Sequence, residues 1–273
     1  MMDVRHLLAE AARRIGERTD AEMLLLHLVR KPRSWLIAHA DDALDTDLQA
    51  AYLALVERRA NGEPVAYIIG LRGFWSLELE VTPATLIPRP ETELLVELAL
   101  QRIPLGSVVH IADLGTGSGA IALAVACERP QARIIATDAS AAALQVARRN
   151  ALRLKLGNLD FIQGDWLAPL ASHRFALILS NPPYIEAGDP HLGRGDLRFE
   201  PSSALASGSE GLDDIHQIVD AALACLEPGG WLLFEHGWNQ GVAARRRLEA
   251  AGYSGVFTAQ DLEQRDRVSG GRR

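Results

Sequence analysis

The sequence predicts a small N-terminal helical domain followed by a doubly wound α/β domain with a mostly parallel, Rossmann-like sheet. In the first part of the chain, apolar residues recur at intervals of three and four. A β-rich segment follows, and after it short apolar strands alternate with helical patterns, as in parallel sheets covered by helices on both faces. We expect domains at residues 1–62 and 91–273, joined by a β-hairpin linker at residues 63–90.

The first domain is predicted to consist of short amphipathic helices, because its apolar residues fall on helical faces. We expect Asp20 to cap the second helix and Pro32 to end it. The apolar positions that carry this prediction are Leu7, Leu8, Ala11, Leu24, Leu25, Leu28, Leu48, Leu53, Leu55 and Val56.

The linker is predicted to be a hairpin, because apolar residues alternate on both sides of a turn at residues 70–73. Residues 91–102, which follow it, return to a helical pattern. The alternating residues are Val65, Tyr67, Ile69, Phe74, Leu77, Leu79 and Val81.

The second domain is predicted to alternate strands with helices, and ligands of such sheets bind outside the carboxyl ends of the strands. The predicted strands are residues 108–114, 133–137, 159–163, 175–179 and 231–235. The predicted helices are residues 119–128, 141–152 and 212–226.

Composition indicates an ordinary globular protein, since 48% of the 273 residues are apolar and 23% are charged. The formal net charge of −7 argues against a protein that coats nucleic acid. Cys127 and Cys225 lie in predicted helices without the spacing of a disulfide framework or metal knuckle, so we expect buried thiols in a reducing compartment. With no signal peptide or long apolar run in the sequence, we expect a cytoplasmic protein.

A glycine-rich turn lies where the first strand of the second domain passes into a helix. Its residues are Asp113, Leu114, Gly115, Thr116, Gly117, Ser118 and Gly119. Such a turn lets the backbone approach a ligand closely, although it can also be a simple connection. Asp138 ends the next strand, where a carboxylate can accept both hydroxyls of a ribose. Together these features indicate an adenosine-type cofactor, and at this point a nicotinamide dehydrogenase remains open.

The motif Asn181-Pro182-Pro183-Tyr184 follows the strand predicted at residues 175–179. Two prolines supply no N–H donors and stiffen the backbone, so carbonyl oxygens and the Asn181 side chain form a rigid set of acceptors. Such a set suits a substrate with an –NH₂ group, and the Tyr184 ring offers a flat face for a planar amide or base. A proline pair that merely ends a strand is the simpler alternative. A hydride-transfer site has no evident use for this cluster, which favours another chemistry.

On these residues the chain resembles the class I S-adenosylmethionine-dependent methyltransferases, and within them the release factor glutamine methyltransferase (PrmC/HemK) family. The glycine turn, Asp138 and the Asn-Pro-Pro-Tyr motif also occur in methyltransferases that act on adenine. More specific is the order of further motifs over nearly the whole chain; residues 269–273 depart from the family because they lack its aromatic finish. The further motifs are Gly62-Glu63-Pro64, Phe74-Trp75, Ile87-Pro88-Arg89-Pro90-Glu91-Thr92-Glu93, Asp165-Trp166, Arg198-Phe199-Glu200-Pro201 and Glu235-His236-Gly237.

The resemblance implies a role for each candidate site residue. Gly115, Thr116, Gly117, Ser118 and Gly119 are expected to hold the methionine part of S-adenosyl-L-methionine. Asp138 is expected to bind its ribose, and Asp165 with Trp166 its adenine ring. Asn181, which also lies beside the cofactor, and the Pro182 carbonyl are expected to accept the two N–H groups of a glutamine side chain. Pro183 and Tyr184 complete this substrate site.

The implied reaction transfers a methyl group to the side-chain nitrogen (N5) of the glutamine in the Gly-Gly-Gln motif of class 1 peptide-chain release factors, which modulates translation termination. The product of the cofactor is S-adenosyl-L-homocysteine, and no metal is needed because the methyl group already carries a good leaving group. We expect a monomer whose partner is the release factor, with no membrane and no stable nucleic-acid partner.

Two alternatives remain open at this stage. An adenine-N6 methyltransferase acting on DNA or RNA would need a positive groove and a pocket for a flipped base, which the net charge of −7 disfavours. A cofactor-binding adaptor without catalysis is disfavoured by the intact motif at Asn181.

His236 follows a buried strand and is expected to be packed and hydrogen-bonded. Arg89, Glu91 and Glu93 open a helix, where acids are favoured by the positive end of the helix dipole. The alternative is that they take part in a domain contact or close the cleft.

Overall fold

The computed structural model describes residues 2–273, which form two compact units. The helical unit comprises the chain up to Leu71 together with Gly193–Phe199. The sheet unit comprises Arg72–Leu192 and Glu200–Arg273. The helical unit therefore extends past residue 62, where we placed its end, and it takes in a short segment from the second half of the chain.

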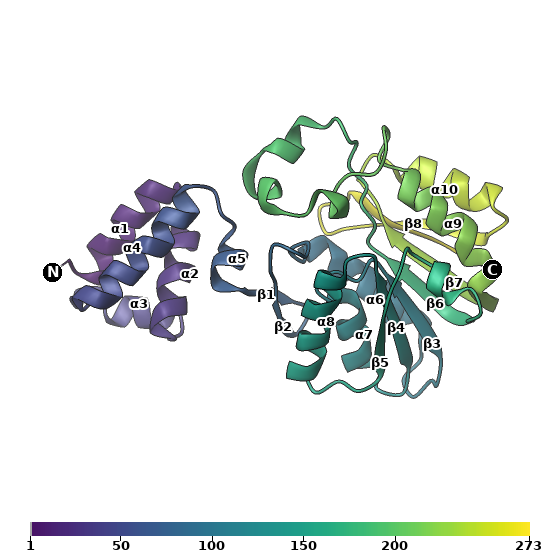
Figure 1. Cartoon of the computed structure of the whole chain (residues 1–273), viewed down its shortest axis with the longest axis horizontal. Helices are drawn as coiled ribbons and strands as arrows, with labels where there is room; N and C mark the ends of the chain where they lie inside the picture. The colour runs from purple at the N-terminus through teal and green to yellow at the C-terminus, as the bar shows by residue number, and fades with distance from the viewer. Residues whose placement is uncertain (1) are drawn as a thin grey trace. The chain divides into compact units, whose positions relative to one another are not determined.

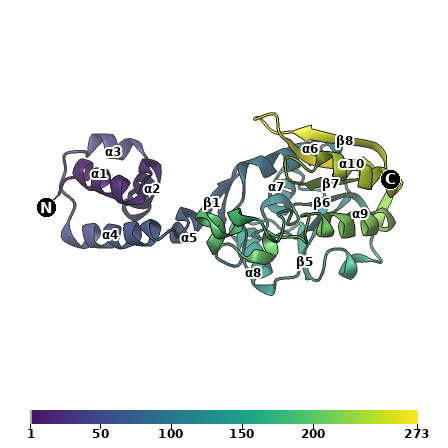
Figure 2. The same cartoon turned by 90° about the horizontal axis from the view of Figure 1, so that it is seen from above.

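The helical unit is a bundle in which α1, α2 and α4 pack on one another around a buried apolar core (Figure 2). Its helices are α1 (Val4–Ile15), α2 (Arg18–Val29), α3 (Ser34–Ala38), α4 (Thr46–Ala60) and α5 (Val65–Ile69). Leu24, Leu25 and Tyr52 are fully buried, and the Tyr52 hydroxyl donates to the Ala21 carbonyl at 2.9 Å. The amphipathic helices predicted for this part of the chain are thus confirmed.

The cap of α2 differs from the prediction. Glu17, not Asp20, is the N-cap residue, and its carboxylate accepts a hydrogen bond from the Thr19 N–H at 3.0 Å. Asp20 lies inside the first turn, where its carboxylate accepts from Arg59 Nε at 2.6 Å. The prediction was wrong because a long-range ion pair uses the carboxylate that the local pattern assigned to the helix end.

The segment before the hairpin is a short helix rather than a strand. Residues Val65–Ile69 form α5, and Gly70, with φ of 78°, closes it by donating its N–H to the Ala66 carbonyl at 2.8 Å. The hairpin consists of β1 (Leu71–Phe74) and β2 (Leu77–Glu80). Its turn lies at Trp75, whose N–H donates to the Glu93 carboxylate at 2.7 Å, and not at residues 70–73. The prediction of a strand was wrong here because α5 is buried from Val65 to Ile68. Its apolar residues therefore do not show the one-sided pattern of a surface helix.

The sheet unit holds a mixed, mostly parallel sheet, which confirms the predicted fold class. The strands are β3 (His110–Leu114), β4 (Arg133–Asp138), β5 (Leu159–Gln163), β6 (Phe175–Ser180), β7 (Leu226–Glu235), β8 (Ser254–Gln260) and β9 (Asp266–Arg272). Their order is β5-β4-β3-β6-β7-β9-β8, and β9 pairs antiparallel with both of its neighbours, β7 and β8, whereas the other pairs are parallel. The carboxyl ends of β3 to β7 consequently meet at one edge.

Helices cover both faces of this sheet, with α6, α7 and α8 on one side and α9 and α10 on the other (Figure 1). Side chains alternate accordingly along β6, where Leu177 and Leu179 face the first layer and Ile178 faces the second. The helices are α6 (Glu93–Arg102), α7 (Ala120–Glu128), α8 (Ala141–Arg153), α9 (Asp213–Cys225) and α10 (Gly241–Ala250). Short 3₁₀ turns are η1 (Pro90–Thr92), η2 (Ala168–Leu170), η3 (Pro190–Gly193), η4 (Gly195–Phe199) and η5 (Ser202–Ala204).

The tail without an aromatic finish forms an interior strand, because β9 lies between β7 and β8. A Cβ atom on Gly270 would lie 2.5 Å from Leu233 Cδ2, and one on Gly271 would lie 2.7 Å from Tyr253 Cβ. Only glycine fits at these two positions, so the departure from the family pattern leaves the strand intact.

The cysteines differ in exposure. Cys225 at the end of α9 is buried as predicted, whereas Cys127 in α7 is exposed, so the prediction of a buried thiol was wrong there. In residues 2–273 no helix combines the length and apolar character needed to cross a lipid bilayer.

Candidate active site

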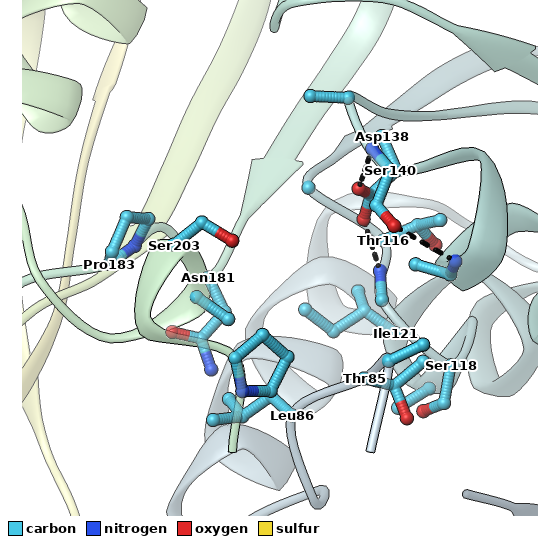
Figure 3. A pocket seen from close by; sticks show the side chains of 18 of the residues that line it. Thr85, Leu86, Thr116, Ser118, Ile121, Asp138, Ser140, Asn181, Pro183 and Ser203 are labelled. Atoms are coloured by element: carbon cyan, nitrogen blue, oxygen red, sulfur yellow. Dashed lines mark hydrogen bonds between the residues drawn. The ribbon is translucent and has the colours of Figure 1, made fainter. Parts of the chain in front are cut away.

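A cavity of about 270 Å³ opens at the carboxyl edge of the parallel strands, within the sheet unit (Figure 3). The glycine turn follows β3, Asp138 ends β4, Asp165 and Trp166 follow β5, and Asn181 follows β6. The cavity lining includes these predicted site residues: Gly115, Thr116, Gly117, Ser118, Asp138, Asp165, Trp166, Asn181 and Pro183. The fold therefore brings together motifs that are far apart in the sequence.

The glycine turn is shaped by contacts that exclude side chains. Gly115 has φ of 71°, and a Cβ atom there would lie 2.8 Å from Cζ3 of the Trp166 indole. Gly119 has φ of 88° and precedes α7, where a Cβ atom would meet Leu123 Cδ1 at 2.8 Å. Gly119 shapes the turn without being one of the residues that line the cavity.

The Asp113 carboxylate stabilises the glycine turn through hydrogen bonds. Its Oδ2 accepts from the Thr116 hydroxyl at 2.6 Å and from the Ala122 N–H at 3.2 Å. Burial raises the pKa of Asp113 to about 7, against these hydrogen bonds, which lower it. The side chain is completely buried, so it serves the turn and not a ligand directly.

Asp138 presents its carboxylate to the cavity while both oxygens are held by the backbone. Oδ2 accepts from the Gly117 N–H at 2.9 Å and Oδ1 from the Ser140 N–H at 2.8 Å (Figure 3). Burial raises the pKa of this carboxyl above its usual value, and the two backbone hydrogen bonds oppose that rise. Each oxygen keeps a further lone pair, so the carboxylate can still accept two ligand hydroxyls.

Trp166 and Asp165 form another wall. The indole Nε1–H donates to Asp214 Oδ1 at 3.2 Å, and the ring lies against the backbone of Gly115. Asp165 Oδ2 accepts from Gln217 Nε2 at 3.0 Å. Asp214 and Gln217 belong to α9, and they hold the side chains of Trp166 and Asp165 in place. Contact of these two side chains with an adenine ring stays a prediction.

The Asn-Pro-Pro-Tyr motif splits between the cavity and the interior. Asn181 and Pro183 line the cavity, and Asn181 Nδ2 donates to the Thr92 hydroxyl at 3.0 Å. Pro182 is buried, and neither it nor Tyr184 is among the lining residues. The Tyr184 ring packs on the core, and its hydroxyl donates to Glu235 Oε1 at 3.1 Å.

Glu235, at the end of β7, is 1% exposed. Burial raises the pKa of its carboxyl to about 7, while the nearby Thr92 hydroxyl, the hydrogen bond from Tyr184 and the charge of Arg267 lower it. Its Oε2 is buried and has no hydrogen-bond partner among the described residues. The neighbouring His236 is buried, with Nε2 2.8 Å from the Ser269 hydroxyl and Nδ1 2.8 Å from the Gly237 carbonyl. This confirms the expectation that His236 is packed and hydrogen-bonded.

Sequence reasoning assigned no ligand contact to two segments that line the cavity, although closing of the cleft was one of the roles considered for Arg89. Arg89 Nη2 donates to Glu200 Oε1 at 2.5 Å, and the Glu200 side chain is fully buried, so this ion pair joins the two segments. The segments overlap the family motifs Ile87 to Glu93 and Arg198 to Pro201 and extend beyond them. Their lining residues are Ala84, Thr85, Leu86, Pro88, Arg89, Thr92, Pro201, Ser203 and Ala204.

The charge of the lining is negative on balance. Asp138 and Asp165 are its acids, and Arg89, its one base among the described lining residues, is paired with Glu200. A cationic ligand group is therefore favoured over an anionic one.

Comparisons with known proteins identify the family models and the fold that this chain matches. A family model described as the PrmC N-terminal domain matches residues 3–70, and one described as a methyltransferase small domain matches residues 90–193. The solved structure of a methyltransferase from Pyrococcus furiosus aligns with a TM-score of 0.55 at 18% identity, covering 79% of this chain and 96% of that one, which shows a shared fold.

Curated relatives match over almost their full length. The release factor glutamine methyltransferase of Xylella fastidiosa (strain 9a5c) is 58% identical over 97% of this chain and 96% of its own. The protein of that name from Escherichia coli (strain K12) is 48% identical over 99% of both chains. Similarity of this extent, together with a methyltransferase fold whose site motifs converge on one cavity, shows that the chain belongs to the release factor glutamine methyltransferase family.

Proposed function

We propose that this enzyme transfers a methyl group from S-adenosyl-L-methionine to the side-chain nitrogen (N5) of the glutamine in the Gly-Gly-Gln motif of class 1 peptide-chain release factors, in the cytoplasm. Its relatives at 58% and 48% identity carry the corresponding name. The proposal depends on the position of the Asn181 amide. Asn181 lines a cavity that also contains Asp138 and Asp165, and its nitrogen donates a hydrogen bond to Thr92.

The cavity fits the cofactor better than it fits a dinucleotide. A sulfonium cation is favoured by the carboxylates of Asp138 and Asp165, which would repel a pyrophosphate. The Gly117 N–H, which a phosphate would need, already donates to Asp138. We assign the glycine turn to the methionine part, Asp138 to the ribose, and Asp165 with Trp166 to the adenine ring.

The acceptors orient the substrate amide. Asn181 Oδ1 and the Pro182 carbonyl accept the two N–H groups of the glutamine side chain, and the stiff proline pair keeps them in place. The nitrogen of a carboxamide is a poor nucleophile because its lone pair is delocalised into the carbonyl. Holding both hydrogens directs the remaining electron density toward the cavity.

Alignment supplies most of the catalysis in this proposal. The cofactor, when bound, provides an electrophilic methyl group on a good leaving group. Holding two reactants in line contributes about 7–11 kcal/mol to the reduction of the barrier. No strong base is required, because the nitrogen becomes acidic once it is methylated and its proton then leaves to water. We further propose that the enzyme acts as a monomer on the folded release factor, without a stable nucleic-acid partner.

The test offers isotopically labelled cofactor to the purified protein with a class 1 release factor, the same factor with its Gly-Gly-Gln glutamine changed to alanine, and duplex DNA and RNA. We expect label only in the unaltered release factor. Label in the nucleic acids would instead identify an adenine methyltransferase. Label in the altered factor would contradict the assignment of the glutamine.

A further inference from the structure

We propose that Thr92 and Glu235 are positioning residues that fix the orientation of the Asn181 amide, so that its oxygen and not its nitrogen meets the substrate. This inference rests on the proposed function, because it concerns how the same site recognises an –NH₂ group. It gives a role to two motifs, around Thr92 and around Glu235, that the sequence analysis left without one.

An asparagine side chain can present either end to a substrate. Its oxygen accepts hydrogen bonds, whereas its nitrogen only donates them. A glutamine amide that offers N–H groups is bound by the oxygen and repelled by the nitrogen. In the structure Asn181 Nδ2 donates to Thr92 Oγ1 at 3.0 Å, which leaves Oδ1 as the end of the amide available to the substrate.

The Thr92 hydroxyl selects the nitrogen only if its own proton points elsewhere. A hydroxyl has one proton and two lone pairs, so it can serve Asn181 as an acceptor while donating to another group. That other group is the Glu235 carboxylate, whose pKa the nearby Thr92 hydroxyl lowers. Glu235 Oε2 is buried and has no hydrogen-bond partner among the described residues, so it is free to accept the Thr92 proton. Thr92 is 3% exposed and lies at the end of η1, so its side chain has little freedom to turn away.

Glu235 sets the direction of the whole chain of hydrogen bonds. An ionised carboxylate accepts and never donates, so the Thr92 proton must point toward it and the Thr92 lone pair toward Asn181. Glu235 is 1% exposed and is held in place by the Tyr184 hydroxyl, which donates to Oε1 at 3.1 Å. Because Asn181 and Tyr184 belong to one rigid motif, the same carboxylate anchors the motif at both ends.

The test compares Thr92→Val, which has nearly the same shape but no hydroxyl, with Thr92→Ser, which keeps it. Affinity for the cofactor is measured by calorimetry, and kcat and KM are measured with a release factor. We expect Thr92→Val to lower kcat about 10- to 100-fold with the cofactor affinity unchanged. We expect Thr92→Ser to recover most of the wild-type kcat.

Thr258→Val is the matched control, because Thr258 in β8 is also a hydrogen-bonded threonine, with its hydroxyl 2.7 Å from that of Ser269, and does not line the cavity. We expect this variant to keep the wild-type kcat. Glu235→Gln should lower kcat as Thr92→Val does, because the glutamine amide can donate a hydrogen bond to Thr92. The Thr92 hydroxyl could then donate to Asn181 Oδ1, which would reverse the direction of the hydrogen bonds. Thermal unfolding of each variant shows whether it is folded.

The outcomes separate the two proposals. A wild-type protein that transfers no methyl group to the release factor contradicts the proposed function itself. A wild-type protein that does so, beside a Thr92→Val variant with unchanged kcat, contradicts only the positioning role. An equal loss of kcat in Thr92→Ser and Thr92→Val, or a loss of cofactor affinity in both, also overturns it, because the hydroxyl would then not be the group that matters.

Discussion

The two halves of the cavity are built in different ways. The half formed by the glycine turn and Asp138 is held by the backbone, since Asp138 accepts from the N–H groups of Gly117 and Ser140. The half formed by Asn181 is held by side chains from remote segments, Thr92 and, behind it, Glu235. The first half joins the ends of two neighbouring strands, β3 and β4, through backbone N–H groups, whereas the second joins the end of β6 to side chains from η1 and β7. Mutations should therefore separate binding in the first half from turnover in the second.

Asn181→Ala should produce the largest effect. It removes an acceptor that acts on the reacting group, and the loss of one such preorganised group costs about 10²–10³ in kcat. The affinity for the cofactor, measured by calorimetry, should stay near that of the wild type. Normal turnover by this variant would show that the amide is not an acceptor in the reaction.

Asp138→Ala should act in the opposite half. Losing charge-assisted hydrogen bonds to a ribose should weaken cofactor binding about 10- to 100-fold, while kcat at saturating cofactor falls much less. The dissociation constant and kcat are measured on the same preparation. If kcat fell as far as in Asn181→Ala and binding did not change, the division between the halves would be wrong.

The pH dependence should report Glu235, whose pKa burial raises to about 7. The groups that act on it are Thr92, Tyr184, Arg267 and Glu91. The carboxylate must be ionised to accept from Thr92, so kcat should rise with pH through about 7 and fall about tenfold per unit below it. The measurement is kcat at saturating substrates in wild type and Glu235→Gln, and the rise should be absent in the variant. A wild-type profile that is flat through this range would contradict the account.

Tyr184→Phe should have the smallest effect. It removes one of the hydrogen bonds that hold Glu235 and leaves the ring in the core, so kcat should fall about 2- to 10-fold. Because that bond lowers the pKa of Glu235, its loss should also move the rise of kcat to higher pH. An unmoved pH profile would mean that the Tyr184 hydroxyl does not act through Glu235.

Much of the fold could be predicted because strand and helix periods are local. The strand Leu159–Gln163 has the predicted bounds, and α7 begins within one residue of its predicted start, at Ala120. The pattern failed where tertiary contacts decide the outcome. α5 is buried on nearly every side, so its apolar residues imitate a strand, and Asp20 pairs with Arg59 from a distant helix instead of capping its own.

The site shows the same limit. Gly115, Asp138 and Asn181 could be placed because each directly follows a predicted strand, and the carboxyl ends of parallel strands share one edge. Thr92 and Glu235 could not be assigned, because nothing near them in the sequence shows that the hydroxyl that accepts from the Asn181 amide lies beside a buried carboxylate. Tyr184 was expected to offer a flat face to the substrate, and the structure instead places its ring on the core.

The central claim is that Asn181 Oδ1 and the Pro182 carbonyl accept hydrogen bonds from the –NH₂ group of one glutamine. Tandem mass spectrometry of a release factor after a single turnover with cofactor-loaded protein tests it most directly. The account predicts one added methyl group, on the side-chain nitrogen of the Gly-Gly-Gln glutamine. A methyl group on a carboxylate, a lysine or any other atom of the factor would contradict it.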